Sequence, residues 1–395
     1  MKKSVAIIGG GPSAFLLAAF LDANKFDVTI YEKNKTAGRK FLVAGKGGFN
    51  ITHSEPIEQL IKRYTPTVFL ESALLNFTNT DYRNWLEQIG IPTFIGSSKR
   101  VYPTAGIKPI EVLNAILTYL KEKGVTIKYE HTFSDWDDNN NPIINNKAIK
   151  SDYTVFSLGG GSWKITGSDG SWLDTFSYKG IDTKPFQASN CAYQVDWKSD
   201  FIKKHEGIPL KNIALFCGNY TQKGEAVITQ FGLEGNAIYG LSPQIRKQLT
   251  TNSKATVFID FKPSLSLEKV VTKIKTSHQK NTTAILKKDL KLSIAQIDLL
   301  KTSLSKDSYL NTVLLAESIK KLPLIIKNTA TIDEAISTVG GIDLADISKN
   351  FELKKLPNQF CIGEMIDWDA PTGGYLLQAC ASIGVALAKH LNKIN

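Results

Sequence analysis

Residues 3–33 read KSVAIIGGGPSAFLLAAFLDANKFDVTIYEK, and this stretch decides the fold class. A short apolar strand, a glycine turn, an apolar helix, a second strand and an acid follow one another. That order is typical of a dinucleotide-binding βαβ unit, which here starts at residue 4. The stretch therefore predicts an α/β fold and a class of cofactor before any chemistry is considered.

The glycine turn forms the phosphate-binding part of this unit. Gly9 permits a tight turn, Gly11 lets the backbone approach a pyrophosphate, and Ala14 is small enough for close packing of helix and strand. The helix that follows offers free N–H groups and the positive end of its dipole to phosphate. We predict that Gly9, Gly11, Pro12, Ser13 and Ala14 contact the cofactor.

An acid ends the second strand of the unit. Glu32 is placed to accept hydrogen bonds from the adenosine ribose, and this disfavours a cofactor with a 2′-phosphate, although Lys33 follows. Arg39, just after Gly38, can neutralise the pyrophosphate through two parallel hydrogen bonds. Glu32, Lys33, Gly38, Arg39 and Lys40 are therefore predicted cofactor contacts.

A second glycine cluster favours FAD over NAD. Gly159 and Gly160 follow the hydrophobic strand 153–158 and predict another close approach of backbone to the cofactor. An NAD dehydrogenase usually carries a catalytic Cys, His or Tyr–Lys set in its second domain, and no such set stands out. No second nicotinamide-binding βαβ unit is visible either.

The segment 359–375 predicts contacts to the flavin half of FAD. A strand at 359–362 leads into acids that can accept hydrogen bonds from the ribityl hydroxyl groups. A glycine pair then opens the last helix, whose N-terminal dipole can stabilise negative charge on the reduced flavin. The predicted contacts here are Gly363, Glu364, Asp367, Gly373, Gly374 and Tyr375.

The glycine-rich, basic stretch 34–55 is expected near the isoalloxazine ring. Asn50 can hydrogen-bond the flavin edge, and His53 can donate a proton because imidazole titrates near neutral pH. Tyr102 is a further candidate acid, with an aromatic core or lid role as the alternative; for His53 the alternative is a surface or capping role. The predicted catalytic residues are His53, Asn50 and Tyr102, and further predicted cofactor contacts are Gly45, Gly47, Gly48, Asn50, Thr52 and Phe133.

Composition excludes several classes of protein. No run approaches the roughly 18–20 apolar residues of a membrane helix, and the N-terminal apolar stretch is a strand rather than a signal peptide. Four cysteines without CxxC spacing predict no metal site and fit a reduced, cytoplasmic compartment. The net charge of +11 suits anionic partners, but the excess lysines are scattered, so we do not expect nucleic-acid binding.

The pattern of residue types along the chain changes after about residue 188, at 263 and again at 331. Apolar and polar residues alternate as in strands over 189–262, and the segments at 263–330 are basic and helical in pattern. From 331 the glycine-rich pattern of an α/β domain resumes. We therefore predict a discontinuous FAD-binding domain of residues 1–188 and 331–395, an inserted β-rich domain of 189–262 and a helical subdomain of 263–330.

With these motifs in place, the chain resembles the HI0933-like (BaiN-type) flavoproteins. GRKFLVAGKGGFNITHSE at 38–55 is similar to the family signature GRKxxxSGxGRCNxTN. Further similar segments follow in order along the chain: SSKRVYP (97–103), SLGGGSWKITGSDGSW (157–172), TQFGLEGNAIYGLS (229–242), STVGGI (337–342) and IGEMIDWDAPTGGYLLQACASIG (362–384). Gly48 and Phe49 stand where the signature has Arg and Cys, so no role of that cysteine carries over; Asn50 and Thr52 match.

The resemblance implies a non-covalent FAD enzyme: a Rossmann-like domain of the two-dinucleotide-binding type, an inserted β-barrel-like domain and a small helical subdomain. Members of the family are linked to reduction of activated C=C bonds. We therefore expect an FAD-dependent oxidoreductase that reduces an enone-like small molecule with electrons from NAD(P)H. The alternatives are a flavin-dependent RNA-modifying or RNA-binding enzyme, and a flavoprotein with a non-redox role in a partner complex.

Overall fold

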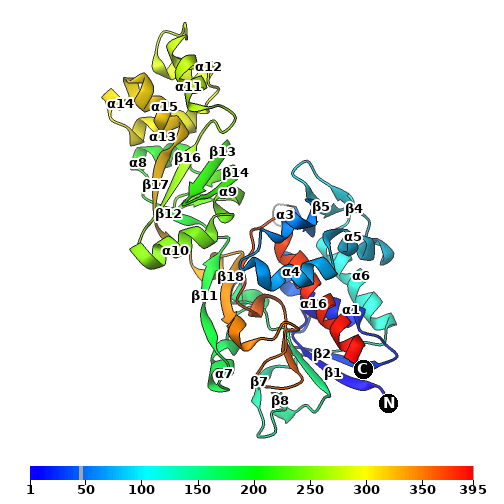
Figure 1. Cartoon of the computed structure of the whole chain (residues 1–395). Helices are drawn as coiled ribbons and strands as arrows, with labels where there is room; N and C mark the ends of the chain where they lie inside the picture. Colours follow the sequence, from blue (N-terminus) through cyan, green and yellow to red (C-terminus); the bar gives the residue numbers. More distant parts are fainter. Residues whose placement is uncertain (44–47, 395) are drawn as a thin grey trace. The chain divides into compact units, whose positions relative to one another are not determined.

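The computed structural model describes residues 1–43 and 48–394. The chain divides into two compact units (Figure 1). The first unit consists of Met1–Ala188 and Ile332–Asn395, and the second unit of Ser189–Thr331. Each unit is described by itself below.

A five-stranded parallel sheet forms the centre of the first unit. Its order is β19 (Gln359–Cys361), β10 (Tyr153–Phe156), β1 (Lys3–Ile8), β2 (Phe26–Glu32) and β6 (Thr126–Tyr129). The run Val5 to Ile8 in β1 is buried throughout, as expected for a strand at the centre of a parallel sheet that is covered on both faces. All strands point the same way, so their carboxyl ends meet at one edge.

Two helices from opposite ends of the sequence pack side by side in this unit (Figure 1): α1 (Pro12–Phe20) and α16 (Tyr375–Ile394). A Cβ at Gly384 would lie 2.4 Å from the carbonyl oxygen of Ser13, so only glycine permits this approach. The other helices of the unit are α2 (Arg39–Val43), α3 (Ile57–Ile61), α4 (Thr67–Asn76), α5 (Asn79–Gln88), α6 (Pro109–Glu122) and α7 (Trp172–Tyr178).

Three small sheets complete the first unit. The first is antiparallel, with the order β3 (Thr52–His53), β5 (Arg100–Pro103), β4 (Thr93–Ile95). The second has the order β7 (Phe133–Trp136), β8 (Pro142–Ile144), β9 (Lys147–Ala148), and the third pairs β11 (Thr183–Ser189) with β18 (Ser337–Ile342). Of these, the β3–β5–β4 sheet carries two of the predicted catalytic residues, His53 on β3 and Tyr102 on β5, and Asn50 lies just before β3.

A closed six-stranded barrel forms the core of the second unit. Its order is β12 (Tyr193–Val195), β15 (Gly232–Glu234), β14 (Tyr220–Ile228), β13 (Pro209–Cys217), β16 (Ala255–Asp260) and β17 (Leu322–Thr329). The helices of the unit are α8 (Ser199–His205), α9 (Asn236–Tyr239), α10 (Ser242–Asn252), α11 (Leu267–Lys275), α12 (Thr282–Lys288), α13 (Ile294–Ser303), α14 (Lys306–Leu310) and α15 (Thr312–Lys320).

One strand corrects the sequence interpretation of this region. β17 lies inside 263–330, which the sequence predicts to be helical. Leu322, Leu324 and Ile326 alternate with exposed residues, and this period of two places every second side chain inside the barrel. The division of the insert into a β-rich and a helical part stays a prediction.

The predicted class, an α/β protein with a Rossmann-like unit, an inserted barrel and additional helices, is confirmed. Among the residues that the structure describes, no helix is both long and apolar enough to cross a lipid bilayer.

Candidate functional site

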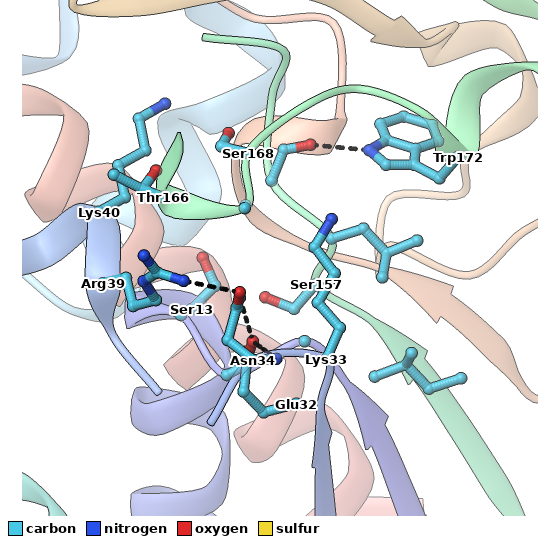
Figure 2. A pocket seen from close by; sticks show the side chains of 18 of the residues that line it. Ser13, Glu32, Lys33, Asn34, Arg39, Lys40, Ser157, Thr166, Ser168 and Trp172 are labelled. Carbon is cyan, nitrogen blue, oxygen red and sulfur yellow. Dashed lines mark hydrogen bonds between the residues drawn. The ribbon is translucent and has the colours of Figure 1, made fainter. Parts of the chain in front are cut away.

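A pocket opens at the carboxyl ends of β1, β2 and β10 (Figure 2). The predicted cofactor contacts that line it are Gly9, Gly11, Pro12, Ser13, Glu32, Lys33, Gly38, Arg39, Lys40, Phe133, Gly159, Gly363 and Glu364. These residues come from five separate stretches of sequence. The structure brings them to one place because parallel strands end at the same edge of the sheet.

The backbone of the glycine turn shapes one wall of the pocket. Gly9 has a φ of +103°, and a Cβ there would lie 2.3 Å from the carbonyl oxygen of Ser157. A Cβ at Gly11 would meet no atom within 4 Å, so the backbone at Gly11 is open to an approaching ligand. Gly11 also caps α1, whose first N–H groups have no partner within the helix. This wall fits a diphosphate.

Glu32 organises the end of β2 and is 7% exposed. Its Oε2 accepts from the N–H of Gly10 at 2.8 Å, and its Oε1 accepts from the backbone N–H and the side-chain Nδ2 of Asn34 at 2.8 and 2.7 Å. A carboxylate offers about four acceptor positions. The protein fills three of them, which leaves one for a ribose hydroxyl group.

Arg39 lies at the same end of the pocket. Its Nη1 donates to Asn34 Oδ1 and its Nη2 to the carbonyl oxygen of Ile165, both at 2.9 Å. Figure 2 shows Arg39, Asn34 and Glu32 joined in one chain of hydrogen bonds. From the sequence, Arg39 is predicted to bind a pyrophosphate through two parallel hydrogen bonds. In the structure, both Nη1 and Nη2 donate to groups of the protein.

Two lysines of the pocket have acidic partners. Lys33 Nζ lies 2.8 Å from Asp169 Oδ2. Lys40 Nζ donates to Ser162 Oγ and to Glu364 Oε2, each at 2.9 Å. Both lysines are partly buried, so their charges lie close to any anionic ligand of the pocket.

Side chains that the sequence analysis does not single out fix the glycine loop after β10. Ser168 Oγ donates to the carbonyl oxygen of Gly160 at 2.9 Å, and Trp172 Nε1 donates to that of Gly159 at 3.0 Å. Other lining residues without a prediction include Gly10, Tyr31, Asn34, His131, Thr132, Ser157, Thr166, Ser171 and Cys380. Ser168 and Trp172 lie in the segment SLGGGSWKITGSDGSW, whose resemblance to the family was the available signal.

Several predicted contacts lie outside the lining of this pocket, among them Ala14, Gly160 and Asp367. Ala14 is buried in α1. Gly160 packs where a Cβ would lie 2.3 Å from Thr338 Oγ1. Asp367 accepts from Lys184 Nζ at 2.7 Å and from the N–H of Gly340 at 3.1 Å. This hydrogen bond from Lys184 to Asp367 raises the pKa of the lysine.

A second cluster forms where α16 begins against β3. Gly373 and Gly374 have φ values of +116° and +97°, and a Cβ at Gly374 would lie 2.6 Å from the backbone of Thr52. The buried Thr52 donates from Oγ1 to Gln378 Oε1 at 2.6 Å. The Thr52 side chain therefore holds α16 to β3, which leaves only its backbone for a cofactor.

His53 and Tyr375 stack at this junction, with ring centroids 5.1 Å apart and an interplanar angle of 21°. Tyr375 donates its hydroxyl group to Glu55 Oε1 at 2.6 Å. Arg63 donates to the same carboxylate, from Nε to Glu55 Oε1 at 3.2 Å and from Nη2 to Glu55 Oε2 at 3.0 Å. Glu55 is 4% exposed and was not predicted from the sequence, although it is the last residue of the quoted segment 38–55.

The charges of this cluster follow from burial and hydrogen bonding. Burial alone would raise the pKa of Glu55, but the hydrogen bonds from Arg63 and Tyr375 outweigh it and lower that pKa. Burial, supported by the hydrogen bond to Glu55, raises the pKa of Tyr375. Burial lowers the pKa of His53 below its usual range, against the opposing effect of Glu55. At neutral pH the cluster holds a carboxylate, a guanidinium, a phenol and a neutral imidazole.

The other predicted catalytic residues lie on or near the β3–β5–β4 sheet. The ring of Tyr102 lies 3.1 Å from where a Cβ of Gly48 would sit and 2.9 Å from that of Gly96. It also stacks on Phe94 with centroids 5.6 Å apart. Asn50 donates its backbone N–H to the carbonyl of Gly48 at 3.0 Å. Gly45 and Gly47 lie outside the described residues.

Known proteins resemble this chain along nearly its whole length. A family model described as the HI0933-like protein Rossmann domain matches residues 3–390. A ribosomal RNA dihydrouridine synthase of Haemophilus influenzae is 24% identical over 401 residues, which cover 98% of each chain. A 3-dehydro-bile acid delta(4,6)-reductase of Clostridium scindens is 22% identical over 393 residues, which cover 95% of each chain.

Among solved structures, the open conformation of a flavocytochrome c3 fumarate reductase is similar. The TM-score is 0.50 at 15% identity, and the match covers 99% of this chain and 78% of that one. At this identity the likeness concerns the fold alone.

Proposed function

The chain belongs to the HI0933-like family of FAD-dependent oxidoreductases, and from that premise we propose that it reduces a carbon–carbon double bond conjugated to a carbonyl group, with electrons from NAD(P)H. The observation that carries the cofactor half of this proposal is the pocket at the ends of β1, β2 and β10. Gly11 is open there, α1 begins there, and Glu32 keeps one acceptor position.

The residues of the first unit have distinct tasks in this proposal. Gly9 to Ser13 bind the diphosphate of FAD, and Glu32 orients its adenosine ribose. Bound FAD supplies hydride transfer. The N-terminal end of α16 stabilises negative charge at the ring end of the flavin.

The names of the two relatives support the choice of reaction. A dihydrouridine differs from a uridine by two hydrogens across C5=C6, a bond conjugated to the C4 carbonyl. A delta(4,6)-reductase of a 3-dehydro bile acid acts on double bonds that are conjugated with a C3 carbonyl. Both names therefore describe the addition of hydrogen to a C=C bond that a carbonyl group activates.

The electron donor rests on a separate argument. The sequence contains no second nicotinamide-binding βαβ unit, so a reduced nicotinamide and the substrate would reach the same flavin in turn. This scheme predicts two half-reactions that can be observed separately, as in other enzymes that act through an intermediate state.

The test follows the colour of the flavin. We expect the purified protein to show flavin bands near ~370 and ~450 nm that bleach when NADH or NADPH is added without oxygen. A 3-oxo-Δ4,6 steroid or 2-cyclohexen-1-one should then restore the bands. If no bands appear after reconstitution with FAD, the proposed cofactor is wrong. If neither nicotinamide bleaches the bands, the proposed electron donor is wrong. If the bands bleach but neither enone restores them, the proposed class of small-molecule substrate is wrong.

A uridine in RNA is the second candidate substrate. Two observations favour it: the name of the Haemophilus influenzae relative and the basic helical segments at 263–330. The scattered positions of the excess lysines, from which we predict no nucleic-acid binding, are evidence against it. If ribosomal RNA is the substrate, RNA treated with the reduced protein gains about 2 Da at single uridines in mass spectrometry, and binding weakens steeply with salt. RNA that stays unchanged while the enones react would exclude this candidate.

A further inference from the structure

The two nitrogen atoms of His53 are held differently, and this decides the state of the ring. Nδ1 lies 3.2 Å from the backbone nitrogen of Glu55, whose N–H donates to it. The ring also makes a hydrogen bond with the backbone of Ser98, which favours the protonated form. The side chain is 13% exposed, and Nδ1 also lies 3.7 Å from Glu55 Oε1, which is farther away than the backbone nitrogen of Glu55.

The hydrogen bond to Nδ1 is compatible with one tautomer of the neutral ring. A neutral imidazole has one donor nitrogen and one acceptor nitrogen, and a protonated ring has two donors. Protonation of Nδ1 would place its N–H against the N–H of Glu55 at 3.2 Å. The geometry therefore favours a neutral His53 with its proton on Nε2.

Glu55 controls this geometry from two directions. Its backbone N–H holds Nδ1, and its carboxylate holds the hydroxyl group of Tyr375, whose ring stacks on the imidazole. Asn79 fixes the backbone between them, because its Nδ2 donates to the carbonyl oxygens of His53 at 2.6 Å and Glu55 at 3.0 Å. Arg63 in turn anchors the carboxylate.

We propose that Glu55 is a positioning residue that holds His53 as a neutral imidazole, protonated on Nε2, where α16 begins. The proposal concerns the ring itself; only its consequence for catalysis rests on the proposed function. A neutral ring has a single N–H, and the bond to the backbone of Ser98 uses it, so His53 in this state is not the proton donor that the sequence predicts.

The charged and titratable groups around His53 come from four elements. Glu55 follows β3, Arg63 follows α3, Arg100 lies on β5 opposite His53, and Tyr375 opens α16. Both arginines and the burial of the ring oppose protonation, as does the backbone N–H of Glu55, whereas the charge of the Glu55 carboxylate and the bond to Ser98 favour it. The positive end of the α16 dipole also opposes protonation of His53.

The direct test is nuclear magnetic resonance of the holoprotein labelled with 15N at its five histidines. The His53 signals are assigned from their loss in His53→Asn, whose amide keeps one donor and one acceptor group. We expect one neutral tautomer with an unprotonated Nδ1 from pH 8 down to pH 6. A mixture of tautomers, or a titration near the ordinary value of about 6.5, would overturn the proposal.

Two variants test the part played by Glu55. Glu55→Gln removes the charge that anchors Tyr375 and Arg63, and Tyr375→Phe removes only the hydroxyl group and keeps the stacked ring. In both we expect His53 to become a mixture of tautomers. Unchanged His53 signals in both variants would show that the carboxylate does not position the ring. If Glu55→Gln fails to fold, Tyr375→Phe still decides.

A second histidine of the chain provides a matched control. His205 is 4% exposed and lies 3.0 Å through Nε2 from Asp298. Asp298→Asn should change the His205 signals and leave those of His53 as they are, and Glu55→Gln should do the reverse. A change of both histidines in either variant would point to a general loss of structure instead of positioning.

The readout also separates this proposal from the proposed function. The tautomer of His53 is measured without nicotinamide or enone, so it can be established even if no reduction is found. Conversely, if enone reduction is found and its rate shows an acid limb near pH 6.5 that His53→Asn abolishes, the reaction class stands and the neutral His53 is overturned.

Discussion

The two clusters of the first unit are built by different means. In the pocket, glycine backbone, a helix terminus and one acid create the binding surface, and most side chains serve to hold the loops. Where α16 meets β3, side chains create the site: a stacked imidazole and phenol, a buried carboxylate and a guanidinium. The pocket has the layout of a dinucleotide-binding site, whereas the second cluster depends on the hydrogen-bond partners of its side chains.

The difference teaches where variation is tolerated. A backbone site depends on φ angles and on the absence of a Cβ, so almost every substitution of its glycines is damaging. A side-chain network depends on hydrogen-bond partners, so isosteric changes can weaken it in small steps. Four predictions sharpen the comparison, and the largest effect comes first.

The largest effect is expected from the glycines of the turn. Gly9→Ala combines a φ of +103° with a Cβ 2.3 Å from the carbonyl oxygen of Ser157, so the protein itself should be destabilised. Gly11→Ala has open space around its Cβ, so the protein should fold normally and bind FAD at least about tenfold more weakly. Thermal unfolding and FAD titration measure the two effects. Equal FAD affinity in Gly11→Ala and the wild type would contradict the assignment of the pocket.

Glu32→Ala should weaken FAD binding next. The change leaves the N–H groups of Gly10 and Asn34 without their acceptor and removes the position left for the ribose. A hydrogen bond to a charged group contributes about 1.5–3 kcal/mol, so we expect a loss of roughly ten- to a hundredfold in FAD affinity. Isothermal titration calorimetry measures it, and Asp137→Ala, at an exposed turn, is the control.

Tyr375→Phe should have a smaller effect, and on stability. Removal of the hydroxyl group takes one donor from the buried Glu55, while the stacking on His53 is kept. We expect the free energy of unfolding to fall by about 1–2 kcal/mol, as measured by denaturation in urea. A loss below a few tenths of a kcal/mol would mean that water or Arg63 replaces the phenol.

The smallest effect is a dependence of stability on pH. The pKa values of His53 and Glu55 are both lowered in the folded protein. Such groups stabilise the fold fully above their unfolded pKa values, and this stabilisation is lost as the pH falls through the folded values. Stability should therefore drop below about pH 6.5, and less so in His53→Asn. Equal drops in wild type and variant would show that His53 is not the group responsible.

The sequence predicts the pocket well because its determinants are local. Gly9, Gly11 and Glu32 stand in one βαβ unit, and strand, turn, helix and acid follow in a fixed order. Long-range partners are harder to predict. Arg39 bonds Ile165 126 positions later, and Glu55 bonds Tyr375 320 positions later, because the fold brings these segments together.

The same limit explains the errors of detail. β17 follows a run of helices in a lysine-rich stretch, so a short alternation of apolar residues was outweighed by its surroundings. Its place is set by pairing with β12 and β16, which the local sequence does not contain. Asp367 stays a predicted cofactor contact, and the structure adds a partner, Lys184, that its motif does not indicate.

The contact of Gly384 with α1 also has a consequence for biosynthesis. α16 lies against the helix of the glycine turn, yet the ribosome makes it more than 350 residues after that turn. At about 5–20 residues per second, this interval lasts tens of seconds. The inserted barrel can fold during that time, because all of its strands lie within Ser189–Thr331. The nascent first unit must wait for its last helix, so flavin loading is a late event in the maturation of the chain.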